Sequence, residues 1–258
     1  MELNFFKYQG TGNDFVIIDN REGTINLTVE QINFLCDRKF GIGADGLMLL
    51  NVKEGYDFEM KYYNADGNES TMCGNGGRCL TQFAFDRGIV KDKYKFIAID
   101  GEHDAYFSED WVNLKMKDVT SIENHCGSFV LNTGSPHYVK PTTDLDAMNV
   151  FEEGKAIRYS DDFKKEGINV NFAESGEEGH ISVRTYERGV ENETLSCGTG
   201  VTASALVFAR EGIGFNRIEV STLGGNLAVE FDKVSDNHFE NIWLCGPATF
   251  VFKGVIEL

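Results

Sequence analysis

Hydrophobic and polar positions along the chain predict short strands interrupted by a few helices. Helical segments without proline cover residues 75–87 and 199–211, and a glycine follows each at the position that often ends a helix. A third helix is expected after Thr28-Val-Glu-Gln31, which resembles a capping box, and it would bury Ile32, Leu35 and Cys36. Alternating or β-rich patterns predict strands at 58–63, 94–99, 111–116, 180–186, 217–221 and 241–245.

The segment 199–211 differs from an ordinary surface helix. Small or apolar side chains occupy nearly all of its faces, including Val201, Ala203, Ala205, Leu206 and Phe208. A helix that is apolar all round is normally enclosed by other elements. We therefore expect a buried central helix here.

The chain also repeats itself. Cys73-Gly-Asn-Gly and Cys197-Gly-Thr-Gly are 124 residues apart, and Gly12 and Gly134 precede these cysteines by 61 and 63 residues. A constant offset across several landmarks indicates an ancient duplication. The same offset of 124 separates three further pairs: Gly88 and Gly212, Gly101 and Gly225, and Phe107 and Phe231.

These patterns together predict an α+β fold. Two similar lobes from the internal duplication would each consist of a curled, mostly antiparallel β-sheet around one buried central helix. Each lobe would present one cysteine, Cys73 or Cys197, at the same structural place. The crossover between the lobes is expected near residues 117–120.

Composition and charge exclude several classes of function. The chain has 258 residues, of which 41% are hydrophobic and 25% charged, and its net charge of −17 argues against a nucleic-acid partner. The N-terminus has no secretory pattern and no window has the length of a membrane span, so we expect a cytoplasmic protein without a membrane partner. In that compartment the six cysteines would be reduced, and the lack of any C-x-x-C pair makes a metal site unexpected.

Cys73 and Cys197 each precede a predicted helix, which is the position that favours a reactive thiolate. Unpaired backbone N–H groups and the helix dipole both lower the pKa of a thiol there, and the following glycines leave N–H groups open to a carboxylate. A lone C-G-x-G would most simply be a buried, inert cysteine. The repetition at matched positions favours the functional interpretation instead. Cys79, Cys126 and Cys245 have no repeat partner and are interpreted as packing residues.

Two thiols that face each other across a ligand suit stereochemical inversion at a carbon atom. One would remove a proton from one face while the other delivers a proton to the opposite face, so the pair would hold one thiolate and one thiol. No lysine stands in a context typical of a Schiff base, so we expect no cofactor. A thiol redox or binding protein with a regulatory disulfide is the alternative from another class. Turnover without an electron acceptor would separate the two.

Several motifs together resemble diaminopimelate epimerase over essentially the whole chain. They are Gly12-Asn-Asp-Phe-Val16, Asn64-Ala-Asp-Gly67, Cys73-Gly-Asn-Gly-Gly-Arg-Cys79, and Tyr186-Glu-Arg-Gly189 before Cys197-Gly-Thr-Gly200. The resemblance implies cofactor-independent conversion of LL- to meso-diaminopimelate, in lysine and peptidoglycan precursor biosynthesis. It also implies that the C-terminal strand returns to the first lobe. The lobes would then be 1–117 with 249–258, carrying Cys73, and 118–248, carrying Cys197, with the active site in the cleft between them.

The same resemblance implies roles for individual residues. Cys73 and Cys197 would be the acid–base pair, with His137 and Glu187 near the thiols to assist proton transfer. The backbone of Gly74, Asn75, Gly198 and Thr199 would cradle the reacting carboxylate. Substrate contacts, chiefly at the distal end, would come from Asn13, Asn64, Ser135, Asn169, Glu187 and Arg188.

Two positions depart from the family pattern. Many members have asparagine where this chain has Ser135 and glutamine where it has Gly46. Both departures concern the distal end of the substrate, so a racemase of another amino acid, such as histidine, is the alternative within this superfamily. The only partner expected is a small amino-acid substrate, and a homodimer is one assembly that the sequence allows.

The segment Gly41-Ile-Gly-Ala-Asp-Gly46 matches the dinucleotide-binding fingerprint G-x-G-x-x-G. That fingerprint must follow a strand and open a helix. Here it follows a predicted helix and leads into the strand-like run 47–50. We therefore do not expect a nucleotide site.

Overall fold

The computed structural model describes residues 1–177 and 179–258. It divides into two compact units: unit 1 is Met1–Leu114 with Gly246–Leu258, and unit 2 is Lys115–Cys245. Among the described residues, no helix is both long and apolar enough to cross a membrane. The lobe boundaries derived from the sequence stay a prediction.

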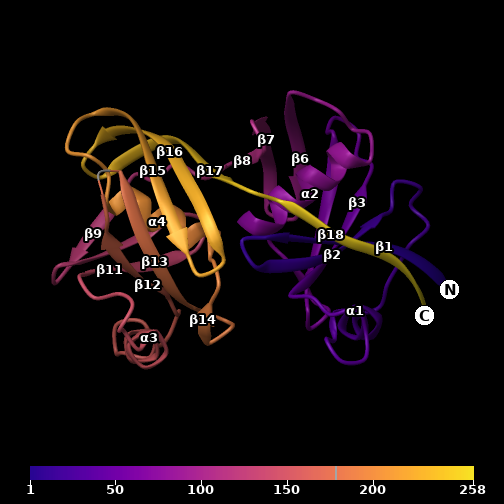
Figure 1. The fold of residues 1–258 in the computed structure, drawn as a ribbon, viewed down its shortest axis with the longest axis horizontal. Coiled ribbons are helices and arrows are strands. Elements are labelled where there is room, and N and C mark those ends of the chain that lie inside the picture. Colours follow the sequence, from indigo (N-terminus) through magenta and orange to yellow (C-terminus); the bar gives the residue numbers. More distant parts are fainter. Residues whose placement is uncertain (178) are drawn as a thin grey trace. The chain divides into compact units, whose positions relative to one another are not determined.

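Unit 1 combines a β-sheet with helices (Figure 1). Its elements are β1 (Glu2–Gly10), β2 (Asn13–Asp19), α1 (Val29–Cys36), β3 (Gly46–Asn51), β4 (Phe58–Asn64), β5 (Glu69–Ser70), α2 (Gly74–Asp86), β6 (Lys93–Ala98), β7 (Gly101–Ser108), β8 (Trp111–Lys115) and β18 (Thr249–Glu257).

Unit 2 contains the same kinds of element, and their order is the same except that β9 comes first where unit 1 has β18 last. They are β9 (Ile122–His125), β10 (Ser128–Asn132), β11 (Pro136–Thr142), α3 (Val150–Arg158), β12 (Asn169–Ser175), β13 (His180–Glu187), β14 (Asn192–Thr194), α4 (Gly198–Val207), β15 (Gly214–Thr222), β16 (Gly225–Ser235) and β17 (His238–Gly246).

The strands of the two units pair in one and the same pattern. In unit 1, β2 is parallel to β3 and β4 is parallel to β6, while the other pairs are antiparallel. In unit 2, β11 is parallel to β12 and β13 is parallel to β15, again with antiparallel pairs elsewhere. Both the α+β class and the duplicated two-lobe organisation predicted from the sequence are thereby confirmed.

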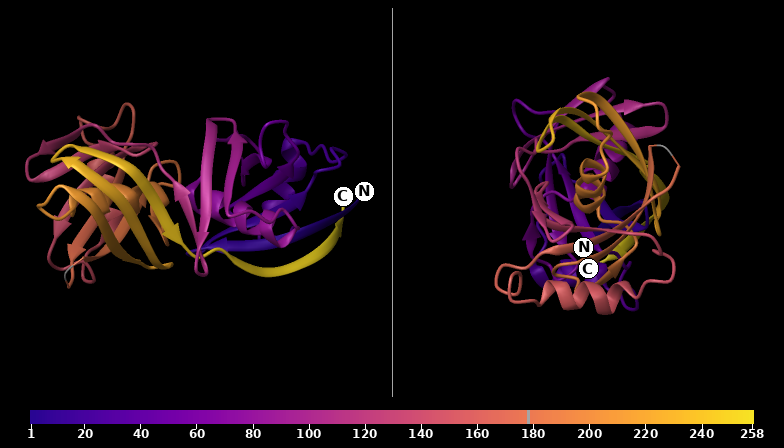
Figure 2. Two further views of the ribbon diagram at one scale, coloured as in Figure 1. Left: turned by 90° about the horizontal axis from the view of Figure 1, so that it is seen from above. Right: turned by 90° about the vertical axis from the view of Figure 1, so that its left-hand side faces the viewer.

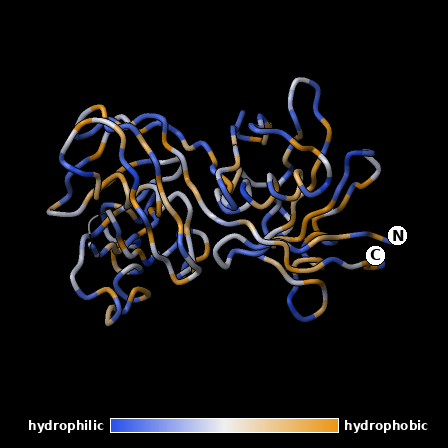
Figure 3. The backbone as a smooth tube through the Cα atoms, turned by 45° about the horizontal axis from the view of Figure 1, so that its top comes forward, coloured by the Kyte–Doolittle hydropathy of each residue, from blue (hydrophilic) through white to orange (hydrophobic). Residues whose placement is uncertain are grey.

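In each half of the chain, the strand that follows the last hairpin pairs with the first strand of the other unit. β9 follows β8 along the chain but pairs with β10 in unit 2, and β18 follows β17 but pairs with β1 in unit 1. β18 lies beside β1 along almost its whole length (Figure 1), and both strands carry hydrophobic stretches (Figure 3). Phe250, Val251, Phe252 and Val255 on β18 remain exposed.

One central helix fills each sheet. Residues 74–81 of α2 are all buried, and so are residues 200–206 of α4. Figure 2 shows α4 enclosed by the strands of unit 2, whereas α3 lies outside them. The nearly all-apolar surface of α4 is explained by this enclosure, because strands surround it on most sides.

The helix ends test the local predictions. α2 ends as expected, with Gly88 in a left-handed conformation (φ 89°) after the C-cap Arg87. The prediction for α4 was wrong: the helix ends at Val207, four residues before the predicted end. Tertiary partners take the backbone groups that would continue it, because Asn216 accepts from the Arg210 N–H and Lys233 donates to the Arg210 carbonyl.

Other predictions were tested at single residues. Thr28 and Gln31 form the predicted capping box of α1, and Cys36 lies in the core, where burial raises its pKa to about 11. The packing interpretation of Cys126 was wrong: it is exposed in the turn between β9 and β10, at φ 53°. That tight turn needs a left-handed residue and leaves its side chain in solvent.

Candidate active site

Both repeated cysteines are the N-cap residues of the central helices. Cys73 precedes α2 and Cys197 precedes α4, each with an extended backbone. The first helical hydrogen bonds run from Gly77 N to Cys73 O (2.7 Å) and from Val201 N to Cys197 O (2.8 Å). The N–H groups between these ends have no partner within the helix and carry the positive end of its dipole. Each helix start is therefore suited to hold a carboxylate beside a thiol.

In unit 1, Asn13 on β2 contacts the cysteine directly. Its Oδ1 lies 3.5 Å from Cys73 Sγ and accepts from Asn75 Nδ2 at 3.3 Å. The Asn75 side chain is held in turn by Arg78, whose Nη2 donates to Asn75 Oδ1 at 3.0 Å. Cys73, Asn75 and Asn13, predicted as site residues, are thus brought together.

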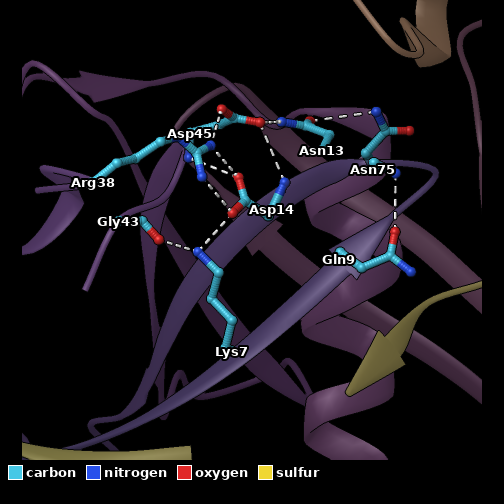
Figure 4. A network of polar contacts seen from close by, with 9 residues as sticks. Lys7, Gln9, Asn13, Asp14, Arg38, Gly43, Asp45 and Asn75 are labelled. Atoms are coloured by element: carbon cyan, nitrogen blue, oxygen red, sulfur yellow. Dashed lines mark hydrogen bonds and ion pairs between the residues drawn. The ribbon is translucent and has the colours of Figure 1, made fainter. Parts of the chain in front are cut away.

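A charged network holds the other end of Asn13 (Figure 4). Asn13 Nδ2 donates to Asp45 Oδ2 at 2.6 Å, and Arg38 bridges Asp45 (2.8 Å) and Asp14 (2.6 Å). Lys7 completes it with an ion pair to Asp14 at 2.7 Å. Burial would raise the pKa of Asp14, but the hydrogen bonds from Arg38 and Lys7 outweigh it and lower that pKa to about 2.

In unit 2, a chain of hydroxyl groups leads from the cysteine to a histidine. Cys197 Sγ lies 3.5 Å from Thr199 Oγ1, which lies 3.3 Å from Ser135 Oγ. Ser135 Oγ is 3.0 Å from His137 Nε2. A second bond, from Thr133 Oγ1 to the Thr199 carbonyl at 2.8 Å, fixes the start of α4 against the loop before β11.

His137 lies fully buried on β11. Its Nδ1 is 3.1 Å from Asn171 Nδ2 on β12. Desolvation, helped by the nearby positive charge of Arg188, lowers the pKa of His137 to about 3, against a weaker opposing effect of Asn171. The imidazole is therefore neutral across the physiological range.

The remaining predicted residues of unit 2 surround this chain. Asn169 donates to Ser135 Oγ (3.1 Å) and to the Pro136 carbonyl (3.2 Å), and it accepts from the Arg188 N–H (2.9 Å). The Arg188 guanidinium is exposed and donates to the Glu166 carbonyl. Glu187 ends β13 and accepts from Thr194 Oγ1 at 3.1 Å.

Asn64 and Gly46 form a cross-strand pair at the ends of β4 and β3. Asn64 is exposed, whereas Gly46 is buried. A Cβ atom at position 46 would lie 2.6 Å from both Tyr62 Cε2 and the Tyr63 carbonyl, so a glutamine does not fit. The departure at Gly46 therefore comes with a reason: the Tyr62 ring occupies the space beside the glycine.

Three residues escaped the sequence-based prediction of the site. Asp45 and Arg78 hold Asn13 and Asn75, and Asn171 holds His137. Arg78 stood inside the cysteine motif, and Asn171 is a polar residue between the apolar Val170 and Phe172 of β12, which is a signal that can be seen in the sequence. Asp45 lies in the discounted glycine segment, which indeed follows α1 and leads into β3.

Comparison with known proteins places this architecture in a family. The family model described as diaminopimelate epimerase matches residues 5–116 and 129–251. The chain belongs to this family. It is accordingly an epimerase, an isomerase.

Curated members of the diaminopimelate epimerase family match almost end to end. The diaminopimelate epimerase of Flavobacterium psychrophilum is 50% identical, covering 98% of this chain and 100% of that protein. The corresponding protein of Chlorobaculum tepidum is 43% identical, with coverages of 96% and 99%.

Solved structures with the same fold have very different sequences. A Bacillus anthracis phenazine biosynthesis protein of the PhzF family has a TM-score of 0.78 at 16% identity, with both chains fully covered. A hydroxyproline epimerase from Agrobacterium vitis has a TM-score of 0.69 at 13% identity and is covered over 93% of its length, against 100% of this chain. These likenesses establish the fold alone.

Proposed function

We propose that this enzyme interconverts LL- and meso-diaminopimelate without a cofactor, using Cys73 and Cys197 as acid and base. The observation that carries the proposal is the matched position of the two thiols. Each is the N-cap of the buried central helix in one of two units with the same topology. The proposal is supported further by relatives named diaminopimelate epimerase, which match this chain over nearly their full length.

The proposed reaction is a balanced exchange of protons. A thiolate takes the α-proton and becomes a thiol, while the other thiol gives its proton to the opposite face and becomes a thiolate. Negative charge that develops on the substrate carboxylate would be met by the N–H groups of Gly74, Asn75, Gly198 and Thr199. These donors belong to helix starts that already exist in the fold.

The distal end of the substrate is assigned to the polar residues around the two helix starts. Arg188 suits a carboxylate, because its planar guanidinium can bind both oxygens. Glu187 suits an ammonium group. Asn13, Asn64, Ser135 and Asn169 would supply further hydrogen bonds.

A racemase acting on another amino acid is the second candidate, because Ser135 and Gly46 replace two side chains of the usual distal pocket. A panel of amino acids separates the candidates. Diaminopimelate should be turned over far faster than amino acids that lack the distal carboxylate and amine. Comparable turnover of histidine would favour the second candidate.

The decisive experiment is incubation with LL-diaminopimelate in heavy water, followed by proton NMR of the α-carbons. The α-proton signal should disappear at one centre as meso product forms, with no added cofactor. The two-thiol scheme would be contradicted if the thiols were oxidised and no product formed. It would also be contradicted if the inverted product kept its α-proton. Activity of this kind would also support the expected place of the enzyme in cytoplasmic lysine and peptidoglycan precursor synthesis.

A further inference from the structure

We propose that the ligand-free enzyme holds its two cysteines in opposite protonation states, Cys73 as the thiol and Cys197 as the thiolate. The inference rests on the proposed two-cysteine function and deepens it. It follows from hydrogen-bond direction in two separate networks, one in each unit. Each network ends on groups that can only donate or only accept, so its direction is determined.

In unit 1, the orientation of Asn75 is set by Arg78. A guanidinium has no acceptor, so the atom that faces it at 3.0 Å must be the amide oxygen of Asn75. The amide nitrogen of Asn75 then points to Asn13 at 3.3 Å, which requires the oxygen of Asn13 on that side.

The contact at the other end of the Asn13 amide fixes the same orientation independently. The amide nitrogen lies 2.6 Å from the Asp45 carboxylate, which forms an ion pair with Arg38 at 2.8 Å. A carboxylate can only accept, so the nitrogen must face it. The oxygen of Asn13 is therefore the atom 3.5 Å from Cys73 Sγ. A sulfur beside a carbonyl oxygen is favoured when it donates, which makes Cys73 a thiol.

In unit 2, two asparagines are oriented in the same way. Asn171 Nδ2 faces the Tyr138 carbonyl at 3.1 Å, and its oxygen accepts from Thr185. Asn169 Nδ2 faces the Pro136 carbonyl at 3.2 Å, and its oxygen accepts from a backbone N–H. Both amide nitrogens are thus identified by carbonyl groups, which can only accept.

These orientations determine the tautomer of His137. Asn171 Nδ2 donates to Nδ1, so the proton of the neutral ring is on Nε2 and is donated to Ser135 Oγ. Ser135 also accepts from Asn169. Both lone pairs of its hydroxyl are then used, and its own proton must go to the remaining neighbour, Thr199 Oγ1.

The hydroxyl of Thr199 is the group in this chain that contacts the sulfur of Cys197. Thr199 accepts from Ser135, and we assign its own O–H to Cys197 Sγ, which lies 3.5 Å away. A donated hydrogen bond stabilises the charged form of an acceptor, which favours the thiolate. The four groups Nε2–H, Ser135 O–H, Thr199 O–H and sulfur therefore form a one-way chain that ends at Cys197.

This polarity defines the resting enzyme. Cys197 would take the first proton and Cys73 would deliver one, and a proton exchange with solvent would restore the resting state afterwards. The charged and titratable groups that the structure links to Cys197 are His137 on β11, through the hydrogen bonds above, and Arg188 after β13, whose charge acts on His137. Around Cys73 they are Arg78 and Cys79 on α2, Asp45 behind Asn13, and Asp100, which accepts from the Met72 N–H.

The test is limited alkylation of the ligand-free enzyme with iodoacetamide over a range of pH, with each cysteine quantified by peptide mass spectrometry. For each cysteine, the pH at which alkylation reaches half its maximal rate is compared, rather than the rate itself. The accessibility of a thiol scales its alkylation rate without moving this pH midpoint. Cys197 should react with the lower midpoint, by about one pH unit or more, which is a tenfold difference in thiolate population. A lower midpoint for Cys73 overturns the proposal.

Two variants test the cause. Thr199→Val removes the O–H that faces Cys197 and should raise the Cys197 midpoint by about one pH unit. Thr202→Val is the matched control, because this threonine on the same helix donates to the Gly198 carbonyl instead. Asn13→Ala should lower the Cys73 midpoint. An unchanged Cys197 midpoint in Thr199→Val contradicts the relay.

Alkylation needs no substrate and no turnover, so the two proposals fail separately. A wild-type enzyme that epimerises diaminopimelate while Cys73 has the lower midpoint refutes only the polarity. An enzyme with the expected midpoints but without epimerisation refutes the proposed function and leaves the hydrogen-bond relay supported.

Discussion

The starts of α2 and α4 have similar backbone conformations, but different side chains contact the cysteine in each. Asn13 and Ser135 each follow the matched glycine of their unit, and Asn75 and Thr199 each stand two residues after the cysteine. In unit 1 these positions carry amides, tied to charged groups through Asp45. In unit 2 they carry hydroxyls, tied to a neutral histidine.

The difference shows how a duplicated scaffold can serve an asymmetric task. Backbone N–H groups at a helix start are the same in both units, so both can hold a carboxylate. Proton transfer needs unlike partners, and side chains supply that difference. Four predictions test the comparison, from the largest expected effect to the smallest.

The largest effect should be common to both units. Cys73→Ala and Cys197→Ala should each lower turnover on the order of 10²–10⁴-fold, because each removes the only proton carrier on one face of the substrate. Cys126→Ala, at an exposed cysteine, is the control and should keep normal turnover. Near-normal activity in either folded active-site variant would falsify the two-base scheme.

The two networks should respond to acid in different pH windows. The pKa of His137 is lowered to about 3, chiefly by desolvation, so between about pH 6.5 and 3 the unfolded chain binds more protons than the folded one. The stability that comes from neutral His137 is therefore complete above about pH 6.5 and falls as the pH drops towards 3. Its size is on the order of 5 kcal/mol at most.

The contribution of Asp14 to stability also falls as the pH drops, but over a lower pH range. Its pKa is lowered to about 2, so its contribution is present above about pH 4 and is lost as the pH falls towards 2. Urea unfolding at pH 7, 5.5 and 4 measures the upper window. His137→Gln should flatten the dependence, whereas His125→Gln, at a partly exposed histidine, should not. An unchanged slope in His137→Gln contradicts this account.

A matched pair of glycines should differ in its tolerance of a methyl group. A Cβ at Gly200 would lie 2.2 Å from Asn171 Oδ1, the amide that holds His137, whereas a Cβ at Gly76 would first meet flexible Met48 Sδ at 3.3 Å. Gly200→Ala should cost about 2 kcal/mol of unfolding free energy, and Gly76→Ala should change it by less than about 1 kcal/mol. Thermal or urea unfolding of both variants checks this, and equal losses would contradict it.

The smallest effect concerns a charge present in one unit only. β13 leads into exposed Arg188, whereas β4 ends in the uncharged Asn64. Arg188→Lys keeps the charge but loses the bidentate geometry, so KM should rise about tenfold while stability changes by less than about 0.5 kcal/mol. Arg217→Lys on β15, where the arginine pairs with Glu219 and Glu230, should leave KM unchanged. A KM that does not rise in Arg188→Lys removes the distal-carboxylate assignment.

Much of this molecule could be predicted from local pattern. The capping box of α1, both cysteine-led helices and the six predicted strands depend on residues close together in the chain, and the structure contains each of them. The constant offset of 124 residues indicated the duplication before any pairing was known. Several strands, such as β1 and β16, and helix α3 were not predicted. Consecutive buried positions interrupt the alternation in β1 and β16, and α3 carries a glycine, Gly154, in its middle.

Tertiary structure decided what each thiol meets. Asn13 lies 60 residues from Cys73 in the chain and Ser135 lies 64 from Thr199, so no local pattern shows these contacts. The early end of α4, set by Asn216 and Lys233, has the same origin. Periodicity and helix caps depend on near neighbours and can be read along the chain. The direction of a hydrogen bond depends on which donor or acceptor the fold brings opposite, and that is determined only when distant strands have paired.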